Sequence, residues 1–180
     1  MIYTTKDLLK NGETQYSIRN KVSKGDLFLL EHGLYSDKQK PYVDEHYICA
    51  KYPHTILTGL SAFYHYDLTD FVPDKIYIVS KQHSFPIRRS DVVQTYQNKS
   101  FVSIGAKKVE SGNGYIRIYD LERTLIELIR LKEKYSPELY YDVLNSFRKI
   151  KDNLDYYKIN KYAKSFKNGD AIIKKIKEVL

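Results

Sequence analysis

The stretch IYTTKDLLKNGETQYSIRNKVSKGDLFLLEHGLYS, residues 2–36, decides the fold of the N-terminal region. Thr5 can cap a short helix, which an Asn-Gly pair then ends. Thr14 can cap a second helix over residues 15–24, because its hydroxyl can accept a hydrogen bond from a first-turn amide. Gly25 suits the left-handed position that follows a helix. The stretch therefore predicts two helices joined by a short turn.

The end of the same stretch predicts a β-hairpin. Residues 27–30 form an apolar run of strand length, His32 and Gly33 can make a tight turn, and residues 34–35 can return as the second strand. Two helices with a short turn, followed by a hairpin, make up a winged helix-turn-helix, an arrangement that reads DNA. We therefore expect a reduced winged helix-turn-helix in residues 1–40.

The second helix is the expected reading helix. Its apolar positions Tyr16, Ile18 and Val22 are expected to point inward. Gln and Asn can contact adenine through two hydrogen bonds, Arg can contact guanine, and Lys and Ser suit phosphates. The predicted DNA-binding residues, one of them from the hairpin turn, are Gln15, Ser17, Arg19, Asn20, Lys21, Lys24 and His32. The competing interpretation is an ordinary solvated helix face.

Composition sets the class of protein. The 180 residues are 42% hydrophobic and 29% charged, which is enough apolar material for a real core under a polar surface. No segment approaches the length of a membrane span, and the N-terminus has no apolar signal region. We therefore expect a cytoplasmic protein without a membrane partner. The single cysteine, Cys49, excludes internal disulfides and a cysteine-rich zinc site.

The net charge of +8 is unevenly distributed. Residues 132–180 carry twelve Lys/Arg against seven Asp/Glu, a net of +5. Such an excess suggests a polyanionic partner, although scattered lysines on a solvated face explain it equally well. The residues that we single out as possible contacts to phosphate or to a partner are Lys81, Arg88, Arg89, Lys158, Lys161 and Lys164. The first three belong to a basic loop between two predicted strands.

Residues 41–180 predict a second domain, separated from the first by the polar segment 37–41. Its expected strands lie at 54–57, 75–80, 92–96, 101–104, 107–110 and 115–119, with a hairpin turn at residues 111–114 between the last two. Its expected helices begin near residues 44, 59, 120 and 136, the last with a Ser-Pro start signal. Two more helices are expected, one around residues 159–166, where apolar residues recur at helical spacing, and one after the Gly-Asp pair at 169–170. The fold class is therefore α+β: the reduced winged helix-turn-helix, then a small mixed sheet with a helical C-terminal region.

The sequence contains no convincing set of catalytic residues. No Asp or Glu is followed two residues later by Lys, as a restriction-type nuclease core needs, and the phosphate-binding Gly-x-x-x-x-Gly-Lys loop is absent. Asp120 and Glu122 resemble the paired acids of a nucleotidyltransferase, but helix capping by Asp120 explains them better. The histidines have no convincing metal-ligand spacing. We expect no enzymatic activity, no metal and no cofactor.

Several segments resemble the AbiEi-type antitoxins of type IV (abortive infection) toxin–antitoxin systems. They are Thr-Thr-Lys-Asp-Leu at 4–8, Gly-Leu-Tyr at 33–35, Ser-Ala-Phe-Tyr at 61–64, Leu-Thr-Asp at 68–70, Pro73, Ile-Tyr-Ile-Val at 76–79, and Tyr-Ile-Arg-Ile-Tyr-Asp-Leu-Glu-Arg-Thr-Leu at 115–125. The resemblance covers about the first 130 residues. Its most specific parts are the Gly-Leu-Tyr wing and the Glu-Arg-Thr segment.

The resemblance implies a DNA-binding repressor of its own operon that counteracts a nucleotidyltransferase-like toxin. Promoter DNA and that toxin would be its partners. The alternative is a toxin-neutralising interaction protein that does not bind DNA. For the second domain we further expect Leu125 and Leu128 to be buried where the Glu-Arg-Thr helix meets the sheet. We also expect Arg123 to be tied to carboxylate or carbonyl groups in a structural role.

Overall fold

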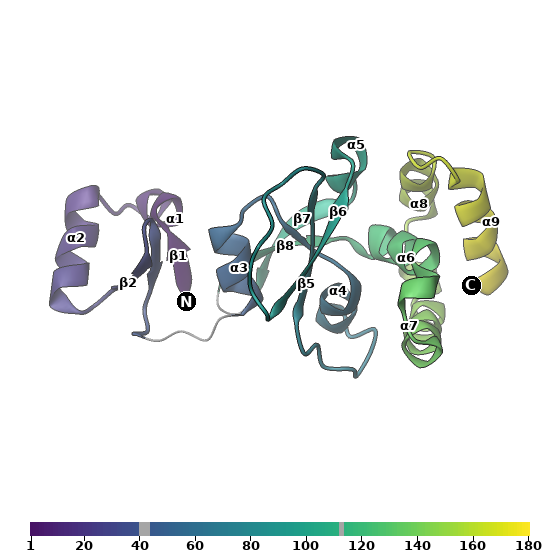
Figure 1. The fold of residues 1–180 in the computed structure, drawn as a ribbon, viewed down its shortest axis with the longest axis horizontal. Helices are drawn as coiled ribbons and strands as arrows, with labels where there is room; N and C mark the ends of the chain where they lie inside the picture. Colours follow the sequence, from purple (N-terminus) through teal and green to yellow (C-terminus); the bar gives the residue numbers. More distant parts are fainter. Residues whose placement is uncertain (40–43, 112–113) are drawn as a thin grey trace. The chain divides into compact units, whose positions relative to one another are not determined.

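The structure, a computed structural model, describes residues 1–39, 44–111 and 114–180 (Figure 1). It shows a mixed α+β protein, as the sequence predicts, and it divides into two compact units. The first unit comprises residues 1–54 and 108–117, and the second comprises 55–107 and 118–180. The predicted boundary between residues 40 and 41 lies outside the described ranges, so a division into 1–40 and 41–180 stays a prediction.

The N-terminal part of the first unit combines two helices with a small sheet. Its elements are β1 (Ile2–Thr4), α1 (Thr5–Lys10), α2 (Gln15–Lys24), β2 (Phe28–Glu31) and β3 (Leu34–Ser36). The strands lie in the order β1-β3-β2, and β3 is antiparallel to both neighbours. The two helices and the hairpin confirm the predicted elements. The sequence gives no sign of β1, because a strand of three residues is too short to show periodicity.

Local capping explains where these helices begin and end. Thr4 caps α1, where the sequence had suggested Thr5: the Thr4 hydroxyl accepts a hydrogen bond from the Asp7 amide at 3.2 Å, and the Asp7 carboxylate accepts one from the Thr4 amide at 3.1 Å. Thr14 caps α2 as predicted, with its hydroxyl 3.1 Å from the Ser17 amide nitrogen. Gly25 ends α2 with a φ of +79°, the left-handed conformation that glycine adopts without strain.

A small core holds α1 and α2 on the hairpin. Leu8, Ile18 and Leu27 are buried together, and Val22 packs against them. Tyr16 was expected to point inward, and that prediction is wrong: 77% of its surface is exposed. Ile18 and Val22 are four residues apart and define the inward line of α2, and a residue two positions before Ile18 falls on the opposite side of a helix with 3.6 residues per turn.

The first unit also contains α3 (Glu45–Lys51), which begins at the expected place. Asp44 caps it by accepting a hydrogen bond from the Tyr47 amide at 3.0 Å. The Tyr47 hydroxyl and the Lys51 ammonium both donate to Glu31 at the end of β2, so a carboxylate of the hairpin contacts α3. The hairpin turn predicted at residues 111–114 has its middle two residues outside the described ranges.

A mixed sheet lies in the middle of the chain. Its elements and the intervening helices are β4 (Ile56–Leu57), α4 (Gly59–His65), β5 (Ile76–Lys81), β6 (Val92–Gln97), α5 (Lys99–Val102), β7 (Ala106–Ser111) and β8 (Gly114–Tyr119). Among the described residues the strand order is β6-β5-β4-β8-β7. β4 is antiparallel to β5 and parallel to β8, and β5 is parallel to β6. The prediction of a small mixed sheet is confirmed.

The prediction of a strand at residues 101–104 is wrong, because the short helix α5 occupies the start of this segment. Asn98 caps α5 by accepting a hydrogen bond from the Ser100 amide at 3.1 Å. The short apolar run of Phe101 and Val102 reads equally well as a strand or as one helical turn, and periodicity alone cannot decide between them. In the structure this turn directs backbone carbonyls toward Arg123 on another helix.

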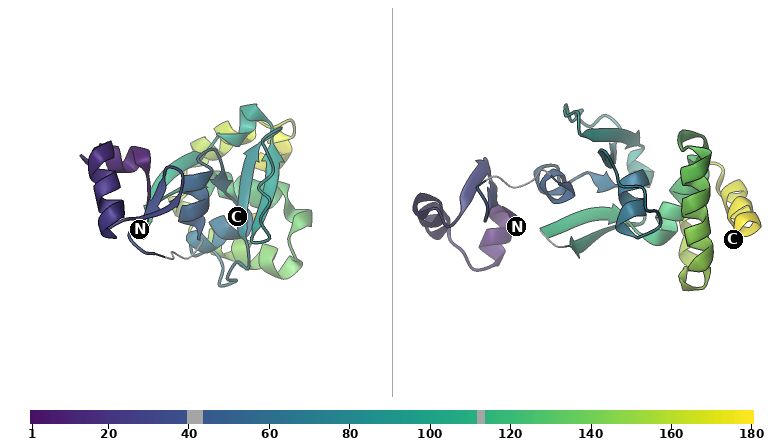
Figure 2. Two further views of the ribbon diagram at one scale, coloured as in Figure 1. Left: turned by 60° about the vertical axis from the view of Figure 1, so that its left-hand side comes forward. Right: turned by 90° about the horizontal axis from the view of Figure 1, so that it is seen from below.

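Helices complete the second unit. They are α6 (Leu121–Arg130), α7 (Pro137–Lys149), α8 (Tyr156–Ala163) and α9 (Gly169–Val179), with single 3₁₀ turns at Lys132–Lys134 and Lys151–Asn153. Figure 2 shows α7 as the long green helix and α9 as the yellow one. Asp120 and Ser136 cap α6 and α7 as expected. Leu125 and Leu128 are fully buried, as predicted. Their position differs from the prediction, because the core around them is formed mainly by helices and contains no residue of the described strands.

Within the described ranges, no helix has the length and apolar character required to cross a membrane.

Candidate functional site

An open groove runs between α2 and the hairpin of the first unit, with a volume of about 400 Å³. Gln15 and Arg19, one turn apart on α2, line one wall of this groove. His32, at the tight turn between β2 and β3, lines the other. The structure thus brings together three of the seven predicted DNA-binding residues. A guanidinium, an amide and an imidazole along one groove offer donors and acceptors suited to base edges and phosphates.

The opposite edge of α2 is occupied by contacts within the protein. Ser17 donates a hydrogen bond to the Glu13 carboxylate at 2.6 Å and also accepts one from the Thr14 amide at 2.8 Å. The Lys21 ammonium forms an ion pair with Glu13. That hydrogen-bonded pair lowers the pKa of Glu13 and raises the pKa of Lys21. Ser17 and Lys21 are therefore weaker candidates for DNA contacts than the sequence suggested.

The two remaining predicted residues of α2, Asn20 and Lys24, are exposed and do not line the groove. Sequence reasoning missed three exposed residues of α2 and the hairpin, and two of them, Ser23 and Leu29, line the groove. Ser23 lines the groove one turn beyond Arg19, a spacing that could have revealed it. Tyr16 and Leu29 are large apolar side chains exposed by 77% and 56%. The periodicity of α2 could have placed Tyr16 outside the core, whereas Leu29 depends on how the hairpin packs.

The basic loop after β5 is held in place by its own hydrogen bonds. Gln94 accepts a hydrogen bond from the Ile87 amide at 2.7 Å. Arg89 forms two hydrogen bonds to Asp91, at 2.9 and 2.8 Å, and this pair lowers the pKa of Asp91. Arg89 is therefore engaged within the loop, whereas Lys81 and Arg88 are exposed.

The predicted lysines of the C-terminal region are all at the surface. Lys158 and Lys161 are exposed on α8, and Lys164 is exposed at its C-terminal end. These positions agree with the amphipathic pattern of the sequence, because Ile159 and Ala163 are the buried residues of the same helix. The structure therefore places these lysines where a polyanionic partner can reach them, without gathering them into a defined site.

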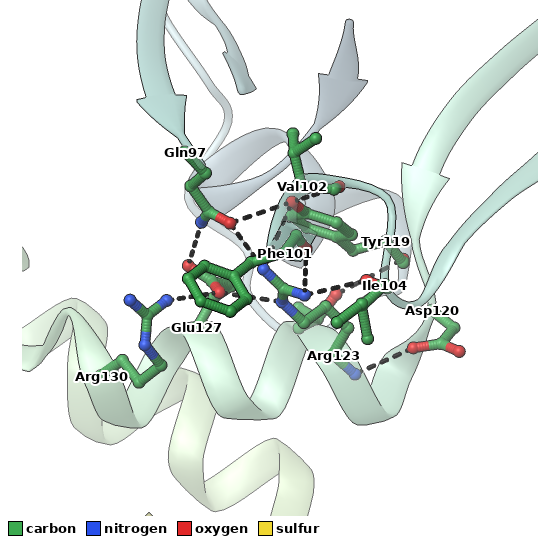
Figure 3. A network of polar contacts seen from close by, with 10 residues as sticks. Gln97, Phe101, Val102, Ile104, Tyr119, Asp120, Arg123, Glu127 and Arg130 are labelled. Carbon is green, nitrogen blue, oxygen red and sulfur yellow. Dashed lines mark hydrogen bonds and ion pairs between the residues drawn. The ribbon is translucent and has the colours of Figure 1, made fainter. Parts of the chain in front are cut away.

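In the second unit, the buried side chain of Arg123 lies at the centre of a network of polar contacts (Figure 3). Its guanidinium donates to the backbone carbonyls of Phe101 and Ile104, both at 2.9 Å, to the Gln97 side chain at 2.6 Å, and to Glu127 at 2.9 Å. This confirms the expected ties to carboxylate and carbonyl groups.

Glu127, the carboxylate partner of Arg123, accepts further hydrogen bonds. Glu127, which is 1% exposed, also accepts hydrogen bonds from Arg130 at 2.7 Å and from the Gln97 amide at 3.0 Å (Figure 3). The Arg123 guanidinium lies 4.4 Å from the ring centre of Tyr119 and 4.8 Å from that of Phe166. A buried ion pair needs such additional hydrogen bonds to offset its desolvation. The Glu-Arg-Thr segment therefore joins α5, α6 and β6 in a structural role.

The two acids that resemble a nucleotidyltransferase pair have separate partners. Asp120 accepts a hydrogen bond from the Arg123 amide at 2.9 Å, as a helix cap does, and another from the Tyr162 hydroxyl at 3.0 Å. Glu122 is buried and accepts one from the Asp155 amide at 3.1 Å. Burial raises the pKa of Asp120. Capping by Asp120, the interpretation that the sequence favoured, is confirmed.

No known protein-family profile and no curated protein matches this sequence. Among solved structures, the chain is similar to the crystal structure of the Rv2827c protein from Mycobacterium tuberculosis, with a TM-score of 0.52 and 15% identity. The match covers 97% of this chain and 71% of that one. At this level of identity the likeness shows the fold alone.

Proposed function

We propose that this protein is a DNA-binding autorepressor and antitoxin of a type IV toxin–antitoxin operon. In this proposal the helices α1 and α2 and the hairpin form a reduced winged helix-turn-helix. The observation that carries the proposal is the groove beside α2, where Gln15, Arg19 and His32 face one space. A reading helix with an adjacent hairpin is the geometry by which such modules reach base edges and the neighbouring backbone.

The shape of the first unit supports DNA binding more than its charge does. Residues 1–40 carry seven Lys/Arg against five Asp/Glu, so long-range attraction to DNA is weak. Affinity must then come from a few close contacts, with Arg19 at a base edge and Lys24 at a phosphate. Lys21 contributes less than the sequence suggested, because Glu13 already neutralises its charge.

The antitoxin role rests on the sequence resemblance. The segments that carry it continue through β5, β8 and α6, so it extends into the second unit. In that unit, Arg123 of the Glu-Arg-Thr segment forms hydrogen bonds that hold α5 against α6. This segment therefore has a structural role in the second unit. The proposed partner is a nucleotidyltransferase-like toxin encoded in the same operon. The protein has no enzymatic role in this proposal.

Titration of the protein's own promoter fragment tests the DNA-binding part. Arg19→Ala should weaken binding by roughly 1–3 kcal/mol and relax base preference at one position. Lys24→Ala should weaken binding to all DNA sequences about equally. It should also reduce the slope of log K against log salt concentration by roughly one unit. Lys38→Ala, which removes an exposed charge beyond the far end of β3, is the matched control. Equal binding by Arg19→Ala, Lys24→Ala and the wild type would remove α2 as a reading helix.

One observation favours the alternative, a toxin-neutralising interaction protein that does not bind DNA. Tyr16 and Leu29 expose large apolar surfaces on α2 and on the hairpin. Exposed aromatic side chains are typical anchors of protein interfaces. If Tyr16→Ser abolishes neutralisation of the toxin while promoter binding is absent in the wild type, this surface serves a protein partner.

A further inference from the structure

A second groove lies wholly within the helical part of the second unit, with a volume of about 500 Å³. Its floor is apolar, and the side chains that form it are Phe101, Ile129, Phe166 and Ile172. Three cationic residues, Arg130, Lys167 and Lys175, line the groove together with Asn168 and Ala171, and no acidic residue belongs to the lining. An apolar floor beside a cluster of cations suits a flat ligand that carries negative charge.

Arg130 is held in a fixed orientation at this groove. Its guanidinium carbon lies 4.1 Å from the ring centre of Phe166, and one of its nitrogens donates to buried Glu127 at 2.7 Å. A guanidinium has five N–H donors, so this single bond leaves others for a ligand. A guanidinium plane that is stacked and hydrogen-bonded is also a surface on which nucleobases stack.

Lys167, in the loop before α9, and Lys175, in the middle of α9, supply charge at the same groove. Lys175 lies 3.4 Å from Glu178, and both side chains are about half exposed. Such an exposed pair contributes little and exchanges readily for another anion. Lysine ammonium groups bind phosphate as point charges. Two lysines beside an oriented arginine therefore match a phosphate attached to a planar group.

We propose that this groove binds a nucleoside phosphate, either as a free nucleotide or as a residue of single-stranded RNA. The base stacks over Arg130, and the phosphate contacts Lys167 and Lys175. An acidic peptide would satisfy the charges but would make no use of the flat guanidinium surface. The proposal concerns the second unit and does not rest on promoter recognition by α2, so either can fail without the other.

Calorimetric titration of the full chain with UTP, with inorganic phosphate and with a short single-stranded RNA tests the proposal. The double variant Lys167→Gln/Lys175→Gln should weaken binding of UTP or of the RNA about tenfold, because two phosphate contacts are lost. For RNA, the slope of log K against log salt concentration should also become less steep by roughly 1.4 units. The matched control is Lys174→Gln/Lys177→Gln, which removes the same charge from exposed positions of α9 outside the groove.

Arg130→Lys separates stacking from charge. It keeps the positive charge but removes the planar surface, so UTP binding should weaken while binding of inorganic phosphate stays unchanged. Binding of UTP identifies a free nucleotide, and binding of the RNA alone identifies a strand. Equal affinity for UTP and inorganic phosphate would overturn the proposal, as would equal losses in the two lysine double variants. Failure of all three probes to bind the wild type would overturn it as well.

Discussion

Replacement of Arg123 by methionine tests the polar network most severely. Methionine has a similar length and no charge, so Arg123→Met removes the guanidinium from a site with no solvent exposure. Glu127 keeps Arg130 and Gln97 as partners, but the carbonyls of Phe101 and Ile104 lose the donor at 2.9 Å. Removal of one member of a buried ion pair costs about 3–5 kcal/mol. Each carbonyl left without a donor costs about 1–3 kcal/mol where water cannot reach it.

These losses overlap, so we expect a total of about 4–6 kcal/mol, a large fraction of the roughly 5–15 kcal/mol that stabilise a typical domain. The assay is urea denaturation followed by circular dichroism. The control is Arg130→Met, which removes an arginine whose side chain is 27% exposed and should cost only about 1 kcal/mol. A loss below about 1 kcal/mol for Arg123→Met would refute the structural role of the network.

Two further predictions concern backbone strain and pH. Gly105→Ala should lower the thermal midpoint, because a Cβ there would lie 2.5 Å from the Arg123 Cβ at a φ of +73°. Gly12→Ala, with a φ of +87° and open space around it, isolates the backbone contribution, so equal losses in the two variants would contradict the packing argument. The hydrogen bond that the Asp44 carboxylate accepts from His46 raises the pKa of His46 above its ordinary 6.5. A raised folded-state pKa stabilises the folded state below the unfolded pKa and loses that effect as pH rises through the folded value. The stability difference between the wild type and His46→Gln should therefore be largest below pH 6.5 and shrink above it, and urea titrations that show the reverse trend would exclude this assignment.

Much of the fold follows from local chemistry. Thr14, Asp120 and Ser136 were predicted as helix caps because a cap depends only on the next three residues. The strand β1 and the helix α5 were not predicted, since each is held mainly by groups far away in the chain. Short elements of this kind have no periodicity of their own.

The candidate site, too, was predictable only where it depends on local sequence. The polar face of α2 was predictable from its spacing, but the groove also depends on how the hairpin packs beside it. The engagement of Lys21 by Glu13, eight residues earlier, requires the turn between α1 and α2 to bring them together. The pairing of Arg89 with Asp91 shows the same limit, because charge counts do not reveal which cations already have partners.

The most direct test of the account is the affinity of the wild-type protein for its own promoter, compared with a scrambled fragment of equal length over a series of salt concentrations. If α2 and the hairpin read DNA, the promoter should bind at least about 10³-fold more tightly than the scrambled fragment at physiological salt. Because few phosphates are contacted, this preference should persist as salt increases. Equal affinity for the two fragments, or binding that disappears equally for both with added salt, would contradict the account.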